Sequence, residues 1–136
     1  MNDQAVIVTT NDLPQAYKII SPVFVQISNR GILKNHAEKL EKEYQSLIED
    51  LQTKGILGRE VSDEEVVLLS RKKELLLDLT GRRMERAFYV ALEELKQKTR
   101  LFGGNAVVGM RYETDILSDN SEFYLQMYGT AVLLEA

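Results

Sequence analysis

The fold of this chain is decided by the stretch LFGGNAVVGMRYETDILSDNSEFYLQMYGTAVLLE, residues 101–135. Gly103-Gly104 is a strong helix stop, because glycine adopts the left-handed conformation at a helix end without steric cost. Two long β-prone runs follow, from Ala106 to Asp115 and from Phe123 to Glu135, and the polar segment between them is typical of a hairpin connection. We therefore expect a helix that ends before Gly103 and two strands after it.

The second of these runs carries apolar side chains on both of its faces. In an alternating strand, one face holds Phe123, Leu125 and Met127, and the other holds Tyr124, Tyr128, Val132 and Leu134. This two-sided pattern indicates burial by a helix on one face and by a neighbouring subunit on the other. These apolar residues on both faces of the strand predict self-association without any reference to a known family.

Two further strands are predicted near the amino terminus. Residues Ala5 to Thr10 are rich in β-branched side chains and precede a turn-forming cluster at 11–14. A second β-prone run extends from Tyr17 to Ser28 and has Pro22 in its middle. Because proline cannot donate a ladder hydrogen bond, this position implies a sheet edge, a bulge or two shorter strands.

The middle of the chain is predicted to be helical. Its apolar residues recur in steps of three and four, which places them on one stripe of a helix: Ala37, Leu40, Tyr44, Leu47 and Leu51. Gly55 and Gly58 are expected to end this helix. Ser62 and Glu65 form a capping-box pattern that predicts the start of a second helix.

The apolar pattern of the second helix changes phase around Thr80-Gly81, which indicates either a kink or two successive helices. We expect Ala37 to Leu79 to form an antiparallel helical hairpin. The order strand, strand, helices, strand, strand then predicts one α+β domain over residues 1–136. Its antiparallel sheet would be backed by a long helix, with residues 31–80 as a helical insertion.

The composition limits the classes of function. With 44% hydrophobic and 28% charged residues among 136, the chain is typical of a folded globular domain. Cysteine is absent, which excludes disulfides and thiolate chemistry, and the net charge of −4 argues against a nucleic-acid partner. The basic stretch at 81–86 is interpreted as the solvated face of a helix turn.

The sequence also lacks the signals of export and of membrane insertion. Its first residues, Met1 to Gln4, have neither a basic nor an apolar segment of the kind found in signal peptides. No apolar stretch approaches the ~20 residues that cross a bilayer. We expect a cytoplasmic protein with no membrane partner.

Three motifs in the carboxy-terminal part resemble the YbjQ-like family: Gly104-Asn105-Ala106-Val107-Val108-Gly109, Tyr112-Glu113-Thr114 and Gly129-Thr130-Ala131-Val132. The resemblance covers both ends of the chain, since three further segments match in order: Ile7-Val8-Thr9-Thr10, Tyr17-Lys18-Ile19-Ile20 and Ala91-Leu92-Glu93-Glu94-Leu95. The resemblance implies a small β-α-β-β fold related to dodecin subunits and assembly into ring-shaped pentamers. The family carries the label "putative heavy-metal-binding domain". The region from Gly31 to Thr80 departs from the family, whose glycine-rich segment after the second strand it replaces, so any pocket built from that segment is in doubt.

Candidate metal ligands are few. His36 is the only histidine, so one chain cannot build a catalytic triad or a multi-histidine metal site. Glu113 and Asp115 share one face of an alternating strand and could offer oxygen ligands to Mg²⁺ or Ca²⁺. The simpler interpretation is that they face solvent and protect a sheet edge. With Asp119 and Glu122, they mark where we would place the family's metal site.

Six positions are candidates for a ligand site or an interface: Gly104, Asn105, Gly109, Tyr112, Gly129 and Thr130. Gly109 and Gly129 interrupt strands, where glycine marks a bulge or a close backbone approach. Packing is the preferred explanation, and the alternative is a ligand or a neighbouring subunit lying against the sheet. Backbone N–H groups at Gly103-Gly104-Asn105 follow a helix carboxyl end, where the dipole repels anions, so a phosphate loop is not expected.

No residues form a recognisable combination of acid, base and oxyanion donor, so we do not expect an enzyme. The first hypothesis is a non-catalytic homo-oligomeric assembly protein whose partner is another copy of itself, a pentamer if the family resemblance holds. The alternative is a metal- or small-ligand-binding protein with an acidic and tyrosine site repeated around the ring. No cofactor is expected, apart from a divalent cation under that alternative.

Overall fold

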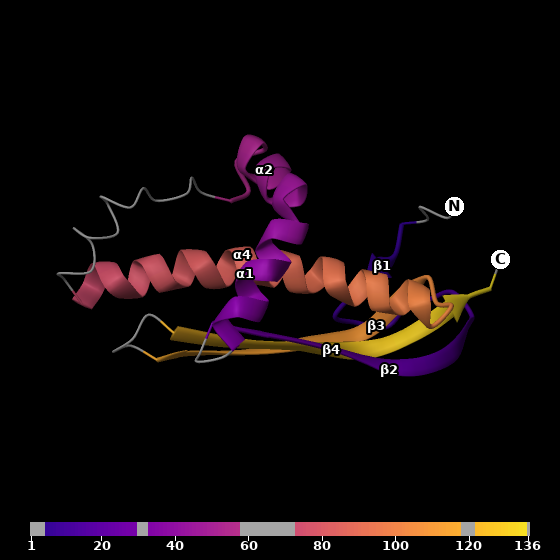
Figure 1. Ribbon diagram of the computed structural model, residues 1–136. Coiled ribbons are helices and arrows are strands. Elements are labelled where there is room, and N and C mark those ends of the chain that lie inside the picture. Colours follow the sequence, from indigo (N-terminus) through magenta and orange to yellow (C-terminus); the bar gives the residue numbers. More distant parts are fainter. Residues whose placement is uncertain (1–4, 30–32, 58–72, 118–121, 136) are drawn as a thin grey trace. The chain divides into compact units, whose positions relative to one another are not determined.

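The computed structural model describes residues 5–29, 33–57, 73–117 and 122–135. In chain order, the elements are β1 (Ile7–Val8), β2 (Tyr17–Ser28), α1 (Leu33–Glu43), α2 (Gln45–Thr53), α4 (Lys73–Leu101), β3 (Ala106–Leu117) and β4 (Glu122–Leu134). Figure 1 labels these elements, and its four strands form one sheet. The expected α+β class, with a sheet and a long helix, is confirmed.

The sheet is mixed, with strand order β1-β3-β4-β2, so the expectation of an antiparallel sheet is wrong for β1. β1 pairs parallel to β3, with Ile7 opposite Ala106. β4 runs antiparallel to β2, because Glu135 N–H donates to Ala16 O at one end and Ser28 Oγ donates to Phe123 O at the other. β2 is thus an edge strand that continues through Pro22, which confirms the edge among the three arrangements that Pro22 allowed.

The chain divides into two compact units. Unit 1 contains Met1–Gln26, Ala91–Glu113 and Gln126–Ala136, and unit 2 contains Ile27–Val90 and Thr114–Leu125. Several elements pass from one unit into the other, since α4, β2, β3 and β4 each contribute residues to both.

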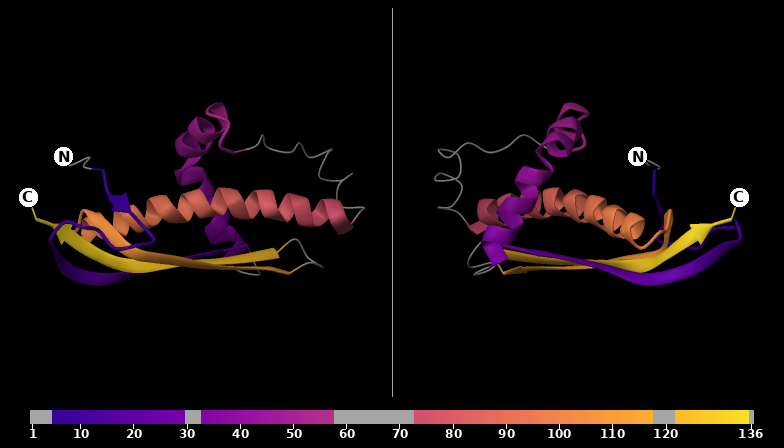
Figure 2. Two further views of the ribbon diagram at one scale, coloured as in Figure 1. Left: turned by 180° about the vertical axis from the view of Figure 1, so that it is seen from behind. Right: turned by 45° about the vertical axis from the view of Figure 1, so that its right-hand side comes forward.

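In unit 1, the carboxy-terminal part of α4 runs along one face of the sheet (Figure 2). Ala91 and Leu95 on this helix are completely buried, as are Val107 and Met127 on the strands. The opposite face has its own small cluster, in which Ala106, Val108 and Val132 pack against Leu13, Tyr17 and Leu134. On β4, Val132 and Leu134 are therefore covered within unit 1 itself.

In unit 2, the predicted apolar stripe is buried or half-buried, but the single helix expected over it is divided. α1 ends at Glu43 and α2 begins at Gln45, with Tyr44 between them at φ −106° and ψ 23°. Gly55 has φ +78° and follows the end of α2, which confirms it as a helix stop. Gly58 and the capping box at Ser62 lie outside the described residues.

Of the two alternatives at Thr80-Gly81, a kink or two successive helices, α4 excludes the second. It is one helix of 29 residues that continues through Thr80-Gly81. A single glycine costs a helix only about 1 kcal/mol, which its many Leu, Lys, Arg and Glu neighbours offset. The hairpin of Ala37 to Leu79 stays a prediction, because part of it is not described. Among the described residues, no helix is long and apolar enough to cross a membrane.

Candidate functional site

Gly109 lies at a β-bulge. Its N–H donates to Asn11 O and the next N–H, that of Met110, donates to Thr9 O, both over 3.0 Å, so two successive amides bond to the same neighbouring segment. Gly109 has φ +62°, and a Cβ there would meet nothing within 4 Å. The expected bulge is confirmed. Packing, the preferred explanation, is wrong at this position, because the left-handed backbone is what favours glycine.

Gly129 meets a different requirement. A Cβ there would lie 2.6 Å from Val107 Cγ1, 3.2 Å from Val108 O and 3.3 Å from Met110 Cα. The neighbouring strand β3 therefore approaches too closely for any side chain. Packing within one chain explains Gly129, and Thr130 beside it is half-buried in β4.

Gly104 and Asn105 join α4 to the sheet. A Cβ on Gly104 would lie 2.9 Å from Val132 O. Asn105 N–H donates to Val132 O over 3.0 Å, and Asn105 Oδ1 accepts from Leu134 N–H over 2.8 Å. The N–H groups of Gly103 and Gly104 donate to Arg100 O and Thr99 O. The amides of 103–105 are thus bonded to backbone carbonyls, which agrees with the expectation that this is no phosphate loop.

The acidic and tyrosine candidates on β3 lie at the surface. Tyr112, Glu113 and Asp115 are all exposed, and the Tyr128 hydroxyl lies 3.5 Å from Glu113 Oε1. Within the described part of the chain, no three His, Cys, Asp or Glu residues come close enough together to hold a metal ion. His36 is exposed on α1, and Asp119 is not described. A metal site at Glu113 and Asp115 stays a prediction.

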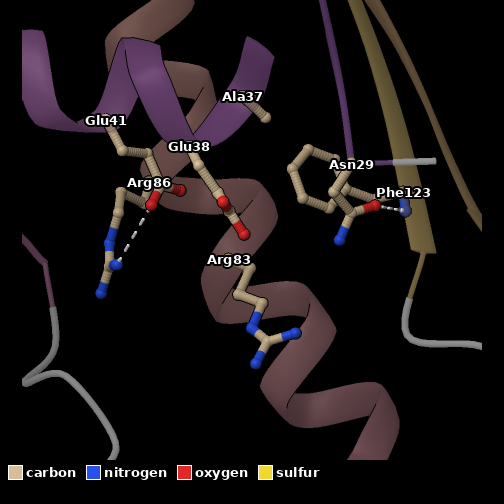
Figure 3. A pocket seen from close by; sticks show the side chains of 7 residues that line it. All are labelled: Asn29, Ala37, Glu38, Glu41, Arg83, Arg86 and Phe123. Atoms are coloured by element: carbon tan, nitrogen blue, oxygen red, sulfur yellow. Dashed lines mark hydrogen bonds and ion pairs between the residues drawn. The ribbon is translucent and has the colours of Figure 1, made fainter. Parts of the chain in front are cut away.

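Unit 2 contains a pocket that sequence reasoning missed. Its volume is about 330 Å³ and it is lined by Asn29, Ala37, Glu38, Glu41, Arg83, Arg86 and Phe123. Figure 3 shows the two glutamates on α1 above the two arginines on α4. Arg83 and Arg86 are half-buried, which corrects the interpretation of this basic stretch as a solvated face. The equal i, i+3 spacing of the Glu and Arg pairs is the signal that could have indicated facing surfaces.

The pocket wall is held by the ends of β2 and β4. Phe123 is buried, and its N–H donates to Asn29 Oδ1 over 2.8 Å. Its carbonyl accepts from Ser28 Oγ over 3.0 Å. Across the pocket, Arg86 Nη1 lies 3.9 Å from Glu41 Oε2, the outer limit of an ion pair. The strand ends and the two helices thus position one aromatic wall and two rows of opposite charge.

The carboxy-terminal part of the chain is similar to a known protein family. Residues 80–135 match a family model described as YbjQ, "Putative heavy-metal-binding". We call residues 80–135 the YbjQ-like segment because of this similarity. A crystal structure of a protein of unknown function from Pediococcus pentosaceus, assigned to the DUF74 family, is also similar: its identity is 18% and its TM-score is 0.49, over 96% of this chain and 98% of that one.

The YbjQ-like segment covers the carboxy-terminal part of α4 together with β3 and β4. It includes all three motifs that carried the resemblance, from Gly104 to Val132. The opening strands and the region 31–79 lie outside it. The pocket in unit 2 therefore combines Arg83, Arg86 and Phe123 from the matched segment with α1 residues from outside it.

Unit 1 exposes many large apolar side chains. Those at least 37% exposed are Ile7, Ile19, Phe24, Leu101, Phe102, Tyr112, Tyr128 and Leu133. Leu101, at the end of α4, is 87% exposed, and its neighbour Phe102 is 51% exposed. Ile19, on the edge strand β2, is 68% exposed. This surface lies on the unit that holds most of the YbjQ-like segment.

A polar pair fixes the loop before β2. The Tyr17 hydroxyl donates to Asp12 Oδ1 over 2.6 Å and Leu13 N–H donates to the same oxygen over 2.8 Å. The Tyr17 hydroxyl is the main cause that lowers the pKa of Asp12, and the Leu13 N–H adds to it. Because the folded pKa is depressed, this pair stabilises the fold above the ordinary aspartate pKa and loses that contribution as the pH falls through the folded value.

We expect Tyr17→Phe to raise the pKa of Asp12 towards its ordinary value, because the largest stabilising bond to the carboxylate is removed while the Leu13 bond remains. The measurement is an NMR titration of the Asp12 side-chain carboxyl carbon. Tyr128→Phe serves as the control, since Tyr128 contacts Glu113 instead. An Asp12 titration that is identical in wild type and Tyr17→Phe would contradict the assignment.

Proposed function

We propose that this protein is a non-catalytic, homo-oligomeric assembly protein whose copies associate through the exposed apolar surface of unit 1. The observation that carries the proposal is the exposure of Leu101 and Phe102 beside each other, together with Ile19 on an edge strand. Fully burying a leucine or phenylalanine side chain contributes about 1.5–3 kcal/mol. A second copy is the partner because the resemblance to the YbjQ-like family implies ring-shaped pentamers.

A closed ring requires two different patches on each subunit, because each copy contacts one neighbour with its first patch and the other neighbour with its second. We assign the first patch to Leu101 and Phe102 and the second to Ile19 and Phe24 on β2. Two patches on separate elements allow the ring to be distinguished from a two-fold dimer, in which one patch contacts its own copy.

Native mass spectrometry of the untagged protein tests this assembly. We expect a pentamer for the wild type, and loss of the pentamer in Leu101→Ser and in Ile19→Ser, since each variant disables one patch. A one-to-one mixture of these variants should give a dimer and nothing larger, because only one intact interface can form. Ile56→Ser removes an exposed apolar side chain from unit 2 and should leave the pentamer unchanged.

Two results would overturn the proposal. A monomeric wild type would contradict the proposed self-association. Pentamers that persist in both serine variants would contradict the assignment of the interface to these two patches. The same spectra address the metal- and ligand-binding alternative, which the family description supports. A constant extra mass on every subunit, lost in the double variant Glu113→Gln and Asp115→Asn, would favour that alternative instead.

A further inference from the structure

The pocket in unit 2 has lining groups of both charges on opposite sides. α1 contributes Glu38 and Glu41, and α4 contributes Arg83 and Arg86. In Figure 3 the Glu38 carboxylate extends from α1 toward α4, and the Arg83 guanidinium lies beyond it along α4. The formal charges of the four side chains sum to zero, so the pocket is bipolar rather than acidic or basic.

This charge arrangement discriminates between classes of ligand. A simple anion would be attracted by the arginines but repelled by the glutamates, and a simple cation would meet the opposite balance. A molecule that carries both charges satisfies both rows at once. The planar guanidinium of Arg83 can bind a carboxylate through two parallel hydrogen bonds, and the carboxylate of Glu38 accepts from an ammonium group.

The remaining lining suits a small ligand with an apolar part. Phe123 and Ala37 supply aromatic and aliphatic surface, and the volume of about 330 Å³ lies at the lower end of the range for small-molecule pockets. Because Asn29 Oδ1 accepts from the Phe123 N–H, the amide group of Asn29 has a fixed orientation at the rim. This bond positions Asn29 and Phe123 at the pocket before any ligand binds.

We propose that this pocket binds a small zwitterion of the α-amino acid class. The ligand carboxylate lies on Arg83, its ammonium group lies on Glu38, and its carbon skeleton lies against Phe123. Arg86 and Glu41, whose side-chain atoms lie 3.9 Å apart across the pocket, form a neutral pair beside this site. The site belongs entirely to unit 2, so it is independent of the self-association that we assign to unit 1.

The test is a saturation-transfer NMR titration of the untagged full-length protein with three probes. Leucine carries both charges, leucinamide carries only the positive charge, and 4-methylpentanoate carries only the negative charge. We expect saturable binding of leucine with a dissociation constant in the millimolar range. Each analogue should bind about tenfold more weakly or worse, because a hydrogen bond to a charged group is lost.

Variants place the binding at the pocket. Arg83→Gln and Glu38→Gln should each weaken leucine binding about tenfold, because each removes one charged partner. Glu85→Gln on α4 and Lys39→Gln on α1 change exposed charges on the same helices and should bind leucine as the wild type does. Circular dichroism confirms that each variant is folded.

Three outcomes would overturn the proposal. The first is no saturable leucine binding up to about 20 mM, a concentration well above a millimolar dissociation constant. The second is equal or tighter binding of either single-charge analogue by the wild-type protein, a result that does not depend on how any variant folds. The third is wild-type affinity in both Arg83→Gln and Glu38→Gln.

Discussion

Gly129→Val is expected to lower the free energy of unfolding by about 3 kcal/mol, the upper part of the range for overpacked sites. The added Cβ would lie 2.6 Å from Val107 Cγ1, and Val107 is completely buried and has no space to move into. The other two contacts, to Val108 O and Met110 Cα, are with backbone atoms of β3. The clash must therefore separate two neighbouring strands. Equilibrium denaturation by urea measures the loss.

Gly109→Ala is the comparison for this prediction, because its added Cβ would meet nothing within 4 Å. Its cost of about 1–2 kcal/mol should come only from holding alanine in a left-handed conformation. A Gly129→Val protein as stable as the wild type would contradict the close approach of β3 and β4. The sequence alone left a neighbouring subunit as one explanation of Gly129, but the clash within one chain makes Gly129→Val a probe of folding.

Leu95→Ala is expected to lower the free energy of unfolding by about 3–4 kcal/mol, within the range measured for leucine truncation in protein cores. Leu95 is completely buried on α4, and its carbonyl accepts a hydrogen bond from the buried Thr99 hydroxyl. The truncation leaves a cavity between the helix and the sheet of unit 1, and the strands cannot move to fill it without losing ladder hydrogen bonds.

Gln97→Ala is the matched control for Leu95→Ala, since Gln97 is exposed two residues further along the same helix. Its stability should stay within about 0.5 kcal/mol of the wild type. Urea denaturation of both variants, with slopes that match the wild type, makes the comparison. A loss below about 1 kcal/mol in Leu95→Ala would show that α4 does not close the core at this position.

The exposed apolar surface of unit 1 and the bipolar pocket of unit 2 suggest a division of roles along α4. Leu101, at the carboxyl end of this helix, belongs to the proposed ring contact, and Arg83, nearer its start, belongs to the proposed ligand site. The native mass spectra and the leucine titration test these roles separately, because neither Leu101→Ser nor Arg83→Gln changes the residues of the other site.

The strands could be predicted from the sequence because their signals are local. α4 ends just before Gly103-Gly104, and the predicted β-prone runs agree with β3 and β4 to within two residues. Helix ends and the alternation of apolar residues depend on neighbours along the chain, so both can be recognised in the sequence. Pro22 limited β2 to three arrangements for the same reason. The resemblance to the YbjQ-like family also rested on local motifs, and residues 80–135 match the family.

Only the tertiary structure decided what depends on residues distant in sequence. In the sequence, Gly109 and Gly129 look alike, because each is a glycine that interrupts a β-prone run. In the structure, Gly109 needs a left-handed backbone at a bulge, whereas Gly129 leaves space for the neighbouring strand. The pocket combines Glu38 and Arg83, which lie far apart in the chain. Local propensity contains no information on which helix faces will meet, because that choice follows from packing of the whole chain.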